Sequence, residues 1–157
     1  TIFIITGNHN MGAEISLKSP IEKFRVPLII YSPLLKKAKQ FQPVVTHRDI
    51  MPSLIGLLKE KYGLSIGKNM SITGIQLDTS NFYRSNVSTA LRYHNQSMSS
   101  FIEDDYYLRD EKVYHITNSL MNSELIEHDS IKKILIDRVK EREVLNSYTF
   151  SENKLIK

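Results

Sequence analysis

Two continuous apolar runs rich in β-branched residues lie near the start of the chain, at residues 2–6 and 27–32. Runs without polar alternation are typical of parallel strands that are covered on both faces. A loop of about 20 residues that contains Gly7 separates them, and Pro33 ends the second run. The pattern therefore predicts two central strands of a parallel sheet.

The clearest helical pattern lies between Asp49 and Gly63. Asp49 suits the N-cap position, Pro52 is tolerated in the first turn, and Gly63 is a suitable stop. The spacing of the apolar residues is that of one buried helix face. These residues are Met51, Leu54, Ile55, Leu58 and Tyr62.

The rest of the chain divides into two further parts. Residues 64–97 are polar and rich in Ser, Asn and Gly, which predicts a long irregular connection. In residues 98–157, SSFIEDDYYLRD and EKVYHITN have the aromatic and β-branched content of an antiparallel hairpin. Asp129 suits the cap of a final helix that extends to about residue 145. The tail after Asn146 is expected to add one short strand. The apolar positions of that helix are Ile131, Ile134, Leu135 and Val139.

Composition adds several exclusions. With 157 residues, 41% of them hydrophobic and 24% charged, the chain has the size and balance of one globular domain or a piece of a larger one. The absence of cysteine excludes disulfides and thiolate metal sites. Aromatic residues do not interleave with a basic stripe, so nucleic acid is not an expected partner. The net charge of +4 suits an anionic substrate such as a phosphate or sulfate ester, and equally a solvated Lys-rich surface.

The first candidate site follows the first strand, where Asn8 and His9 are adjacent. Imidazole is a common ligand for zinc and manganese, and an amide oxygen binds harder ions. The alternative is a turn-forming Asn beside a surface His. The second candidate is His47, which precedes the predicted helix start and is placed to bind a metal or an anion there. A hydrogen-bonded loop histidine is the alternative for this residue.

Three cations lie in the loop that leads into the second strand, and each is a candidate contact for an anionic substrate or an ordinary solvated charge. They are Lys18, Lys23 and Arg25.

Three segments, taken in order, resemble a known family. TIFIITGNHNMG resembles the strand and Thr-Gly-Asp-His segment of the sulfatase-like branch of the alkaline phosphatase superfamily. FRVPLIIYSPLLKKAKQF is similar to that family's Val-Pro-Leu-hydrophobic-Tyr-Ser-Pro segment, and THRDIMPSLIGLLKEKYG to its Ser/Thr-His-x-Asp-x-x-Pro helix start. The matched part covers residues 1–63. The closest resemblance is to the lipoteichoic acid synthase-like, membrane-anchored branch of bacterial cell envelopes.

The resemblance implies a fold and a chemistry. The fold is α/β: part of an alkaline-phosphatase-like sheet, with parallel central strands and helices, followed by a C-terminal antiparallel hairpin and helix. The chemistry is attack by a Thr, Ser or modified Cys nucleophile on a sulfate or phosphate ester, assisted by a divalent metal (Mn, Zn, Ca or Mg). The family's metal-ligating pair falls on Asn8 and His9, and His47 falls near the same site as a substrate or second-metal residue.

Two departures shape the expectations for this chain. Asn8 stands where the family has Asp, which removes a negative charge from the metal site. The nucleophile and further acidic ligands lie upstream of the matched segments in this family. We therefore expect a C-terminal segment of a hydrolase or phosphoglycerol-type transferase that is inactive alone. The alternatives are a non-catalytic relative that binds an envelope glycan or a partner, and a related metal-dependent phosphatase or phosphomutase.

The two apolar runs also predict assembly. Without further layers, strands of this kind expose apolar faces and open edges. A homo-oligomer, most simply a two-fold dimer, is the expected state.

Overall fold

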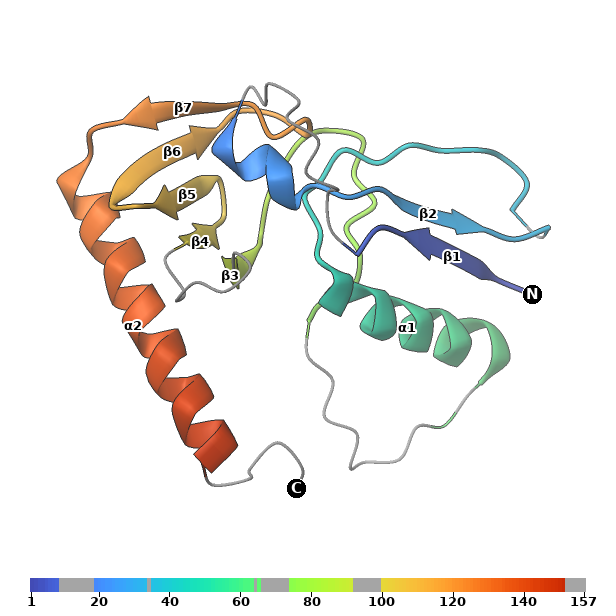
Figure 1. Ribbon diagram of the computed structural model, residues 1–157. Coiled ribbons are helices and arrows are strands. Elements are labelled where there is room, and N and C mark those ends of the chain that lie inside the picture. Colours follow the sequence, from blue (N-terminus) through green and yellow to red (C-terminus); the bar gives the residue numbers. More distant parts are fainter. Residues whose placement is uncertain (9–18, 34, 64, 66–73, 92–99, 152–157) are drawn as a thin grey trace.

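The computed structural model describes residues 1–8, 19–33, 35–63, 65, 74–91 and 100–151. Its elements form two groups (Figure 1): a two-stranded ribbon near helix α1, and a five-stranded sheet beside helix α2. Within this described part, no helix combines the length and the apolar character needed to cross a membrane.

The two predicted strands exist, but their pairing differs from the expectation. β1 (Phe3–Thr6) and β2 (Leu28–Tyr31) form an antiparallel ribbon in which Phe3 faces Tyr31 and Thr6 faces Leu28. The prediction of parallel central strands in an α/β sheet is therefore wrong. Among the described strands every ladder is antiparallel, and a parallel pairing occurs only as an isolated bridge between Val44 and Ser85.

The reason for this error lies in what an apolar run specifies. Unbroken apolar residues were interpreted as burial on both faces, yet most side chains of the ribbon are exposed. The described part of the connection between the strands contains a short 3₁₀ helix, η1 (Pro20–Phe24), and not the long crossover helix typical of a parallel pair.

The larger sheet is a meander of five strands, each paired antiparallel with the next along the chain. The strands are β3 (Ser88–Leu91), β4 (Ser100–Glu103), β5 (Tyr106–Arg109), β6 (Lys112–Ile116) and β7 (Ser123–Ile126). Two-residue turns join β4 to β5 and β5 to β6, and Asp104, Asp110 and Glu111 adopt positive φ there. Short hairpins favour such backbone angles, which Asp accommodates better than most residues.

The expected hairpin is therefore part of a larger sheet. The turn between its two predicted segments, at Asp110 and Glu111, joins β5 to β6 as expected. The segment interpreted as its first strand is instead two strands, because the chain reverses at Asp104 and Asp105. β3 lies within the predicted irregular connection, and β7 falls in a stretch for which no strand was predicted.

The hydrophobic core occupies both faces of this sheet. Alternate residues of β4 point to opposite sides, so Phe101 packs with Leu135 of α2 (Asp129–Ser151) while Ile102 packs with Ile21 of η1. Tyr107 completes the second cluster and is fully buried. Helix α2 thus covers one face, and η1 with the segment around Val87 covers the other.

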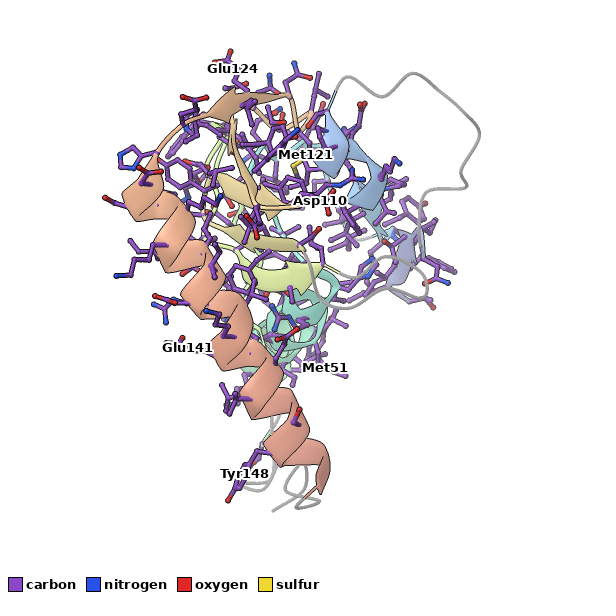
Figure 2. The ribbon with its side chains drawn as sticks, turned by 60° about the vertical axis from the view of Figure 1, so that its left-hand side comes forward. Met51, Asp110, Met121, Glu124, Glu141 and Tyr148 are labelled. Carbon is purple, nitrogen blue, oxygen red and sulfur yellow. The ribbon has the colours of Figure 1, made fainter. Side chains whose placement is uncertain are left out.

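Helix α2 has Asp129 as its first residue and not as its cap, and it is longer than expected. The ring Nδ1 of His128 accepts the N–H of Ile131 at 3.4 Å and so caps the helix. It continues to Ser151, so residues 147–151 are helical and contain no part of the short strand predicted after Asn146; the rest of that tail, residues 152–157, lies outside the described residues. Figure 2 shows the C-terminal turns of α2 extending past the sheet, with Tyr148 on that part. Leu135 is the buried anchor of the helix, whereas Ile134 is half exposed.

Helix α1 (Ile50–Tyr62) confirms the predicted position of the first helix. Gly63 ends it in the left-handed conformation, with its N–H directed to the carbonyls of Leu58 and Lys59. The prediction of a buried face is wrong, since no residue of α1 is fully buried and Met51 and Tyr62 are exposed.

Candidate functional site

Two residues of the matched motifs meet where β1 ends and the first helical turn begins. Thr6, the last residue of β1, places its Oγ1 2.9 Å from Nε2 of His47, the first residue of the 3₁₀ helix η2 (His47–Asp49). The two residues lie 41 positions apart in the chain, and both are exposed. The contact forms a hydroxyl–imidazole pair that is accessible to solvent.

The backbone beneath His47 is fixed by its neighbours. Thr46 is the N-cap of η2, and its N–H and hydroxyl both donate to Oδ2 of Asp49, at 2.7 and 2.9 Å. Oδ1 of the same carboxylate accepts the backbone N–H of Ile75 at 2.9 Å. Asp49 is buried, and it is the last residue of η2, directly before α1. This carboxylate therefore fixes the backbone that carries His47. Both of its oxygens accept hydrogen bonds from within the chain.

The predicted role of Asp49 needs one correction. Asp49 occupies the N-cap position of α1, but its side chain makes no capping bond to that helix. It closes the capping box of η2 instead, one turn earlier.

The second matched segment joins the same place through Gly7. A Cβ built on Gly7 would lie 3.1 Å from both Cβ and Cγ1 of Val26, so the backbone after β1 passes close to the start of β2. Only glycine fits this approach without a shift of Val26. Arg25, which precedes Val26, is exposed, and Lys23 lies exposed in η1. All three motif segments thus meet around the C-terminal end of β1.

Of the other predicted site residues in the first loop, the structure describes only Asn8. Asn8 follows Gly7 and is exposed. His9 and Lys18 lie outside the described residues. The structure therefore brings His47 next to the segment that carries Asn8. The hydrogen bond that joins them is made by Thr6.

A divalent metal does not fit the described residues taken alone. They contain no group of three or more His, Asp or Glu side chains arranged to hold an ion. Around Thr6 the nearby donors are a hydroxyl, an imidazole and an amide, and the carboxylate of Asp49 is already occupied by three hydrogen bonds. Divalent ions such as Mn²⁺ and Mg²⁺ favour carboxylate oxygens, which this set does not supply.

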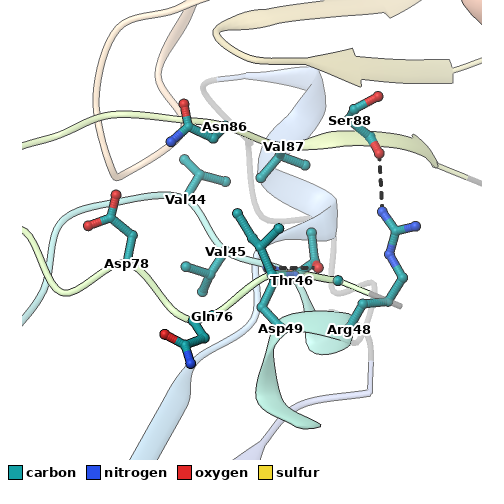
Figure 3. Close-up of a pocket in the computed structure, with 12 residues that line it drawn as sticks. Val44, Val45, Thr46, Arg48, Asp49, Gln76, Asp78, Asn86, Val87 and Ser88 are labelled. Atoms are coloured by element: carbon teal, nitrogen blue, oxygen red, sulfur yellow. Dashed lines mark hydrogen bonds between the residues drawn. The ribbon is translucent and has the colours of Figure 1, made fainter. Parts of the chain in front are cut away.

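A pocket of about 240 Å³ borders η2 (Figure 3). Arg48 borders it, and its Nη2 donates to the carbonyl of Ser88 at 3.1 Å. The pocket combines valine side chains with polar groups from three segments that are distant in sequence. Its lining includes Val44, Val45, Gln76, Asp78, Asn86 and Val87.

One charged group at this pocket has a strongly perturbed acidity. The side chain of Arg84 hydrogen-bonds to Asp78, and this bond, with further bonds from Ser80, lowers the pKa of Asp78 to about 2. Asp78 therefore stays ionised and is committed to Arg84. Sequence reasoning missed this pocket, because Arg48 occupies the unspecified position of the matched Thr-His-x-Asp segment, Gln76 and Asn86 lie outside the matched segments, and only the fold brings the three together.

Comparison of the chain with protein-family models, with curated proteins and with solved structures gives no match in any of the three.

Proposed function

We propose that this chain supplies the histidine-bearing part of the active site of a metal-dependent hydrolase or phosphoglycerol-type transferase that acts on sulfate or phosphate esters. The single observation that supports this proposal is the 2.9 Å contact between Thr6 Oγ1 and His47 Nε2. It brings together the two motif segments whose resemblance suggests the activity. The corresponding setting is the bacterial cell envelope, where the resembled enzymes are membrane-anchored.

The residues of the site are suited to an anionic ester oxygen. When its imidazole is protonated, His47 donates from both ring nitrogens and carries a positive charge. The hydroxyl of Thr6, already beside Nε2, offers a further donor to the same oxygen. The capping box around Asp49 holds the backbone of His47 in place before substrate binds. In this proposal His47 and Thr6 together bind the ester oxygen.

The metal remains part of the proposal for the whole enzyme. When bound, a divalent ion supplies charge neutralisation on the transferred group. Its carboxylate ligands would come from residues outside the described set, since the described donors do not suffice. We further propose that this chain alone is inactive, because the matched segments do not include the family's nucleophile.

Paramagnetic broadening of NMR signals tests the location of the site. On titration with Mn²⁺ at up to about 1 mM, we expect the signals of Thr6, Asn8 and His47 to broaden first. His47→Ala should remove this pattern, whereas His128→Ala, at another exposed histidine, should preserve it. Broadening that is strongest elsewhere, or unchanged in His47→Ala, would contradict the proposal.

A second titration tests the ligand class. Inorganic phosphate and sulfate should shift the ring signals of His47 and leave those of His115 unchanged, because His115 lies on β6 against the ring of Tyr106. Equal shifts at both histidines would indicate general ionic effects and no site. Hydrolysis of p-nitrophenyl sulfate or phosphate by the chain alone would contradict the proposed inactivity.

A non-catalytic relative is the second candidate, and the neutral amide of Asn8 favours it. If Asn8 occupies a ligand position, Asn8→Asp should tighten Mn²⁺ binding at least tenfold, which corresponds to about 1.4 kcal/mol. Calorimetric titration of the two proteins makes the comparison. Equal affinities would place Asn8 outside the metal site and would remove the observation that favours this second candidate.

A further inference from the structure

One face of the β1–β2 ribbon is built from large apolar side chains and lies open. Phe3 pairs with Tyr31 and Ile5 pairs with Ile29, so these four side chains share one face of the ribbon. Each is between 50% and 56% exposed, and the rings of Phe3 and Tyr31 lie 6.0 Å apart. We call these four residues the ribbon face.

The ribbon has few other contacts within the described chain. Beyond each other, β1 and β2 make few contacts with the other named helices and strands, and neither pairs with a third strand. In Figure 1 the ribbon projects away from the five-stranded sheet. No residue of β1 or β2 carries a charge, although charged side chains are the usual protection of such strands.

The size of the ribbon face is that of a modest protein interface. Half-exposed Phe and Tyr side chains offer about 100 Å² each and half-exposed Ile about 50 Å², so the four residues present about 300 Å² of apolar surface. A standard interface of about 800 Å² per partner contains about 450 Å² of non-polar area. The ribbon face supplies most of that area in one continuous patch, which is enough for a weak dimer.

We propose that the ribbon face is the contact between two copies of this chain, packed face to face about a two-fold axis. The face is self-complementary, since a second copy offers equally large apolar side chains and no charge that must be desolvated. Two stacked ribbons would lie about 10 Å apart, as the layers of β-sandwiches do. This inference is independent of the proposed function.

A lipid surface is the principal alternative occupant, because exposed Lys36, Lys37 and Lys39 follow β2. The strand edges disfavour it. Each strand of the ribbon has one edge without a described partner, and hydrocarbon cannot satisfy the backbone N–H and C=O groups of an open edge. Face-to-face packing of two ribbons leaves those edges in water.

Light scattering and sedimentation over about 1–200 µM test the proposal. We expect the mass to rise toward twice 18.2 kDa, with a midpoint in the range of tens of micromolar. Ile5→Lys and Ile29→Lys should each raise the chain concentration at the midpoint of dimer formation at least tenfold. The matched control is Leu125→Lys on β7, which adds the same charge at a strand residue that is 58% exposed and should leave the midpoint unchanged. A monomer at 200 µM, or an equal effect of the control, would overturn the proposal.

A second measurement uses substitutions that add no charge to the strands. Because the chain has no cysteine, Ile29→Cys and Leu125→Cys each introduce a single thiol. Maleimide labelling of Ile29→Cys should slow severalfold as the chain concentration rises, while labelling of Leu125→Cys should stay constant. Concentration-independent labelling of Ile29→Cys would count against the dimer. Binding of the monomer to phosphatidylglycerol vesicles through Ile29, detected as slower labelling, would assign the face to a membrane instead.

Discussion

The phenol of Tyr83 donates a hydrogen bond to the carboxylate of Asp105, with 2.8 Å between Oη and Oδ1. The same phenol lies 3.3 Å from the carbonyl of Ile116, whose own N–H bonds to the carbonyl of Asp105. One side chain thus ties the segment before β3 to the β4–β5 turn and the end of β6.

Removal of this phenol should weaken the fold. We expect Tyr83→Phe to lower the free energy of unfolding by about 1–2 kcal/mol, because a partly buried carboxylate and a carbonyl lose their donor. Tyr62→Phe is the matched control, since Tyr62 is exposed at the end of α1. Urea unfolding of both variants makes the test, and equal losses would show that the hydrogen bond contributes nothing specific.

The same residue predicts a loss of stability at alkaline pH. Burial, and then the hydrogen bond and charge of Asp105, raise the pKa of Tyr83 well above its usual value. The unfolded chain releases this proton near pH 10, whereas the folded chain keeps it. The stabilisation is therefore complete below about pH 10 and declines as the pH rises above it. Unfolding followed between pH 8 and 11.5 should show a steeper decline for the wild type than for Tyr83→Phe, and parallel curves would contradict the expected shift.

Asp49 should be the most sensitive polar residue near the candidate site. Asp49→Ala leaves the N–H groups of Thr46 and Ile75 without an acceptor, which we expect to cost about 2–3 kcal/mol. Asp49→Asn should cost nearly as much, because one carboxylate oxygen becomes a donor that faces a backbone N–H. Chemical denaturation measures both effects. Asp129→Ala at the exposed start of α2 is the control, and a loss there as large as that of Asp49→Ala would contradict this account.

The sequence predicted the helices better than the sheets, and the reasons are physical. A helix is largely specified by local periodicity and by its caps, so the stop at Gly63 was assigned correctly and the start of α2 was assigned to within one residue. Strand pairing is specified by distant partners. The run from Ile2 to Thr6 looks the same whether its neighbour is parallel or antiparallel, so its local pattern indicated a strand but not the direction of pairing.

The candidate site shows the same division. The resemblance placed His47 near Asn8 and His9, whereas the contact that the structure describes is between His47 and Thr6, which had no predicted role. The pocket beside Arg48 was not predicted, because its lining residues come from three separate segments. The turn at Asp104 and Asp105 was missed since an Asp-Asp pair between apolar residues is a weaker hairpin signal than Asp-Gly.

Two glycines offer a matched test of a backbone contact. Gly74 and Gly63 both have positive φ, but a Cβ on Gly74 would clash with the backbone carbonyl of Arg48, whereas Gly63 has open space. We expect Gly63→Ala to cost about 1 kcal/mol from the left-handed backbone alone. Gly74→Ala should cost at least 1 kcal/mol more and should loosen the pocket beside Arg48. Equal melting temperatures for the two variants would show that the segment around Gly74 moves freely away from η2.

The last prediction concerns Asp78, whose acidity is set mainly by Arg84. The pKa of Asp78 is lowered to about 2, first by the side-chain hydrogen bond from Arg84 and then by that from Ser80. In the unfolded chain a carboxyl of this type titrates near 3.9. The contribution of the pair to stability is therefore present above about pH 4 and is lost as the pH falls toward 2. Carboxyl ¹³C shifts should give a midpoint near 2 for Asp78 in the wild type and a higher midpoint in Arg84→Gln, below 3.8 because the bonds from Ser80 remain. Ser80→Ala should give an intermediate midpoint, because it removes the smaller of the two side-chain bonds. A wild-type midpoint near 4 would mean that the Asp78–Arg84 pair does not persist in solution, and that this side of the pocket lacks a fixed charge.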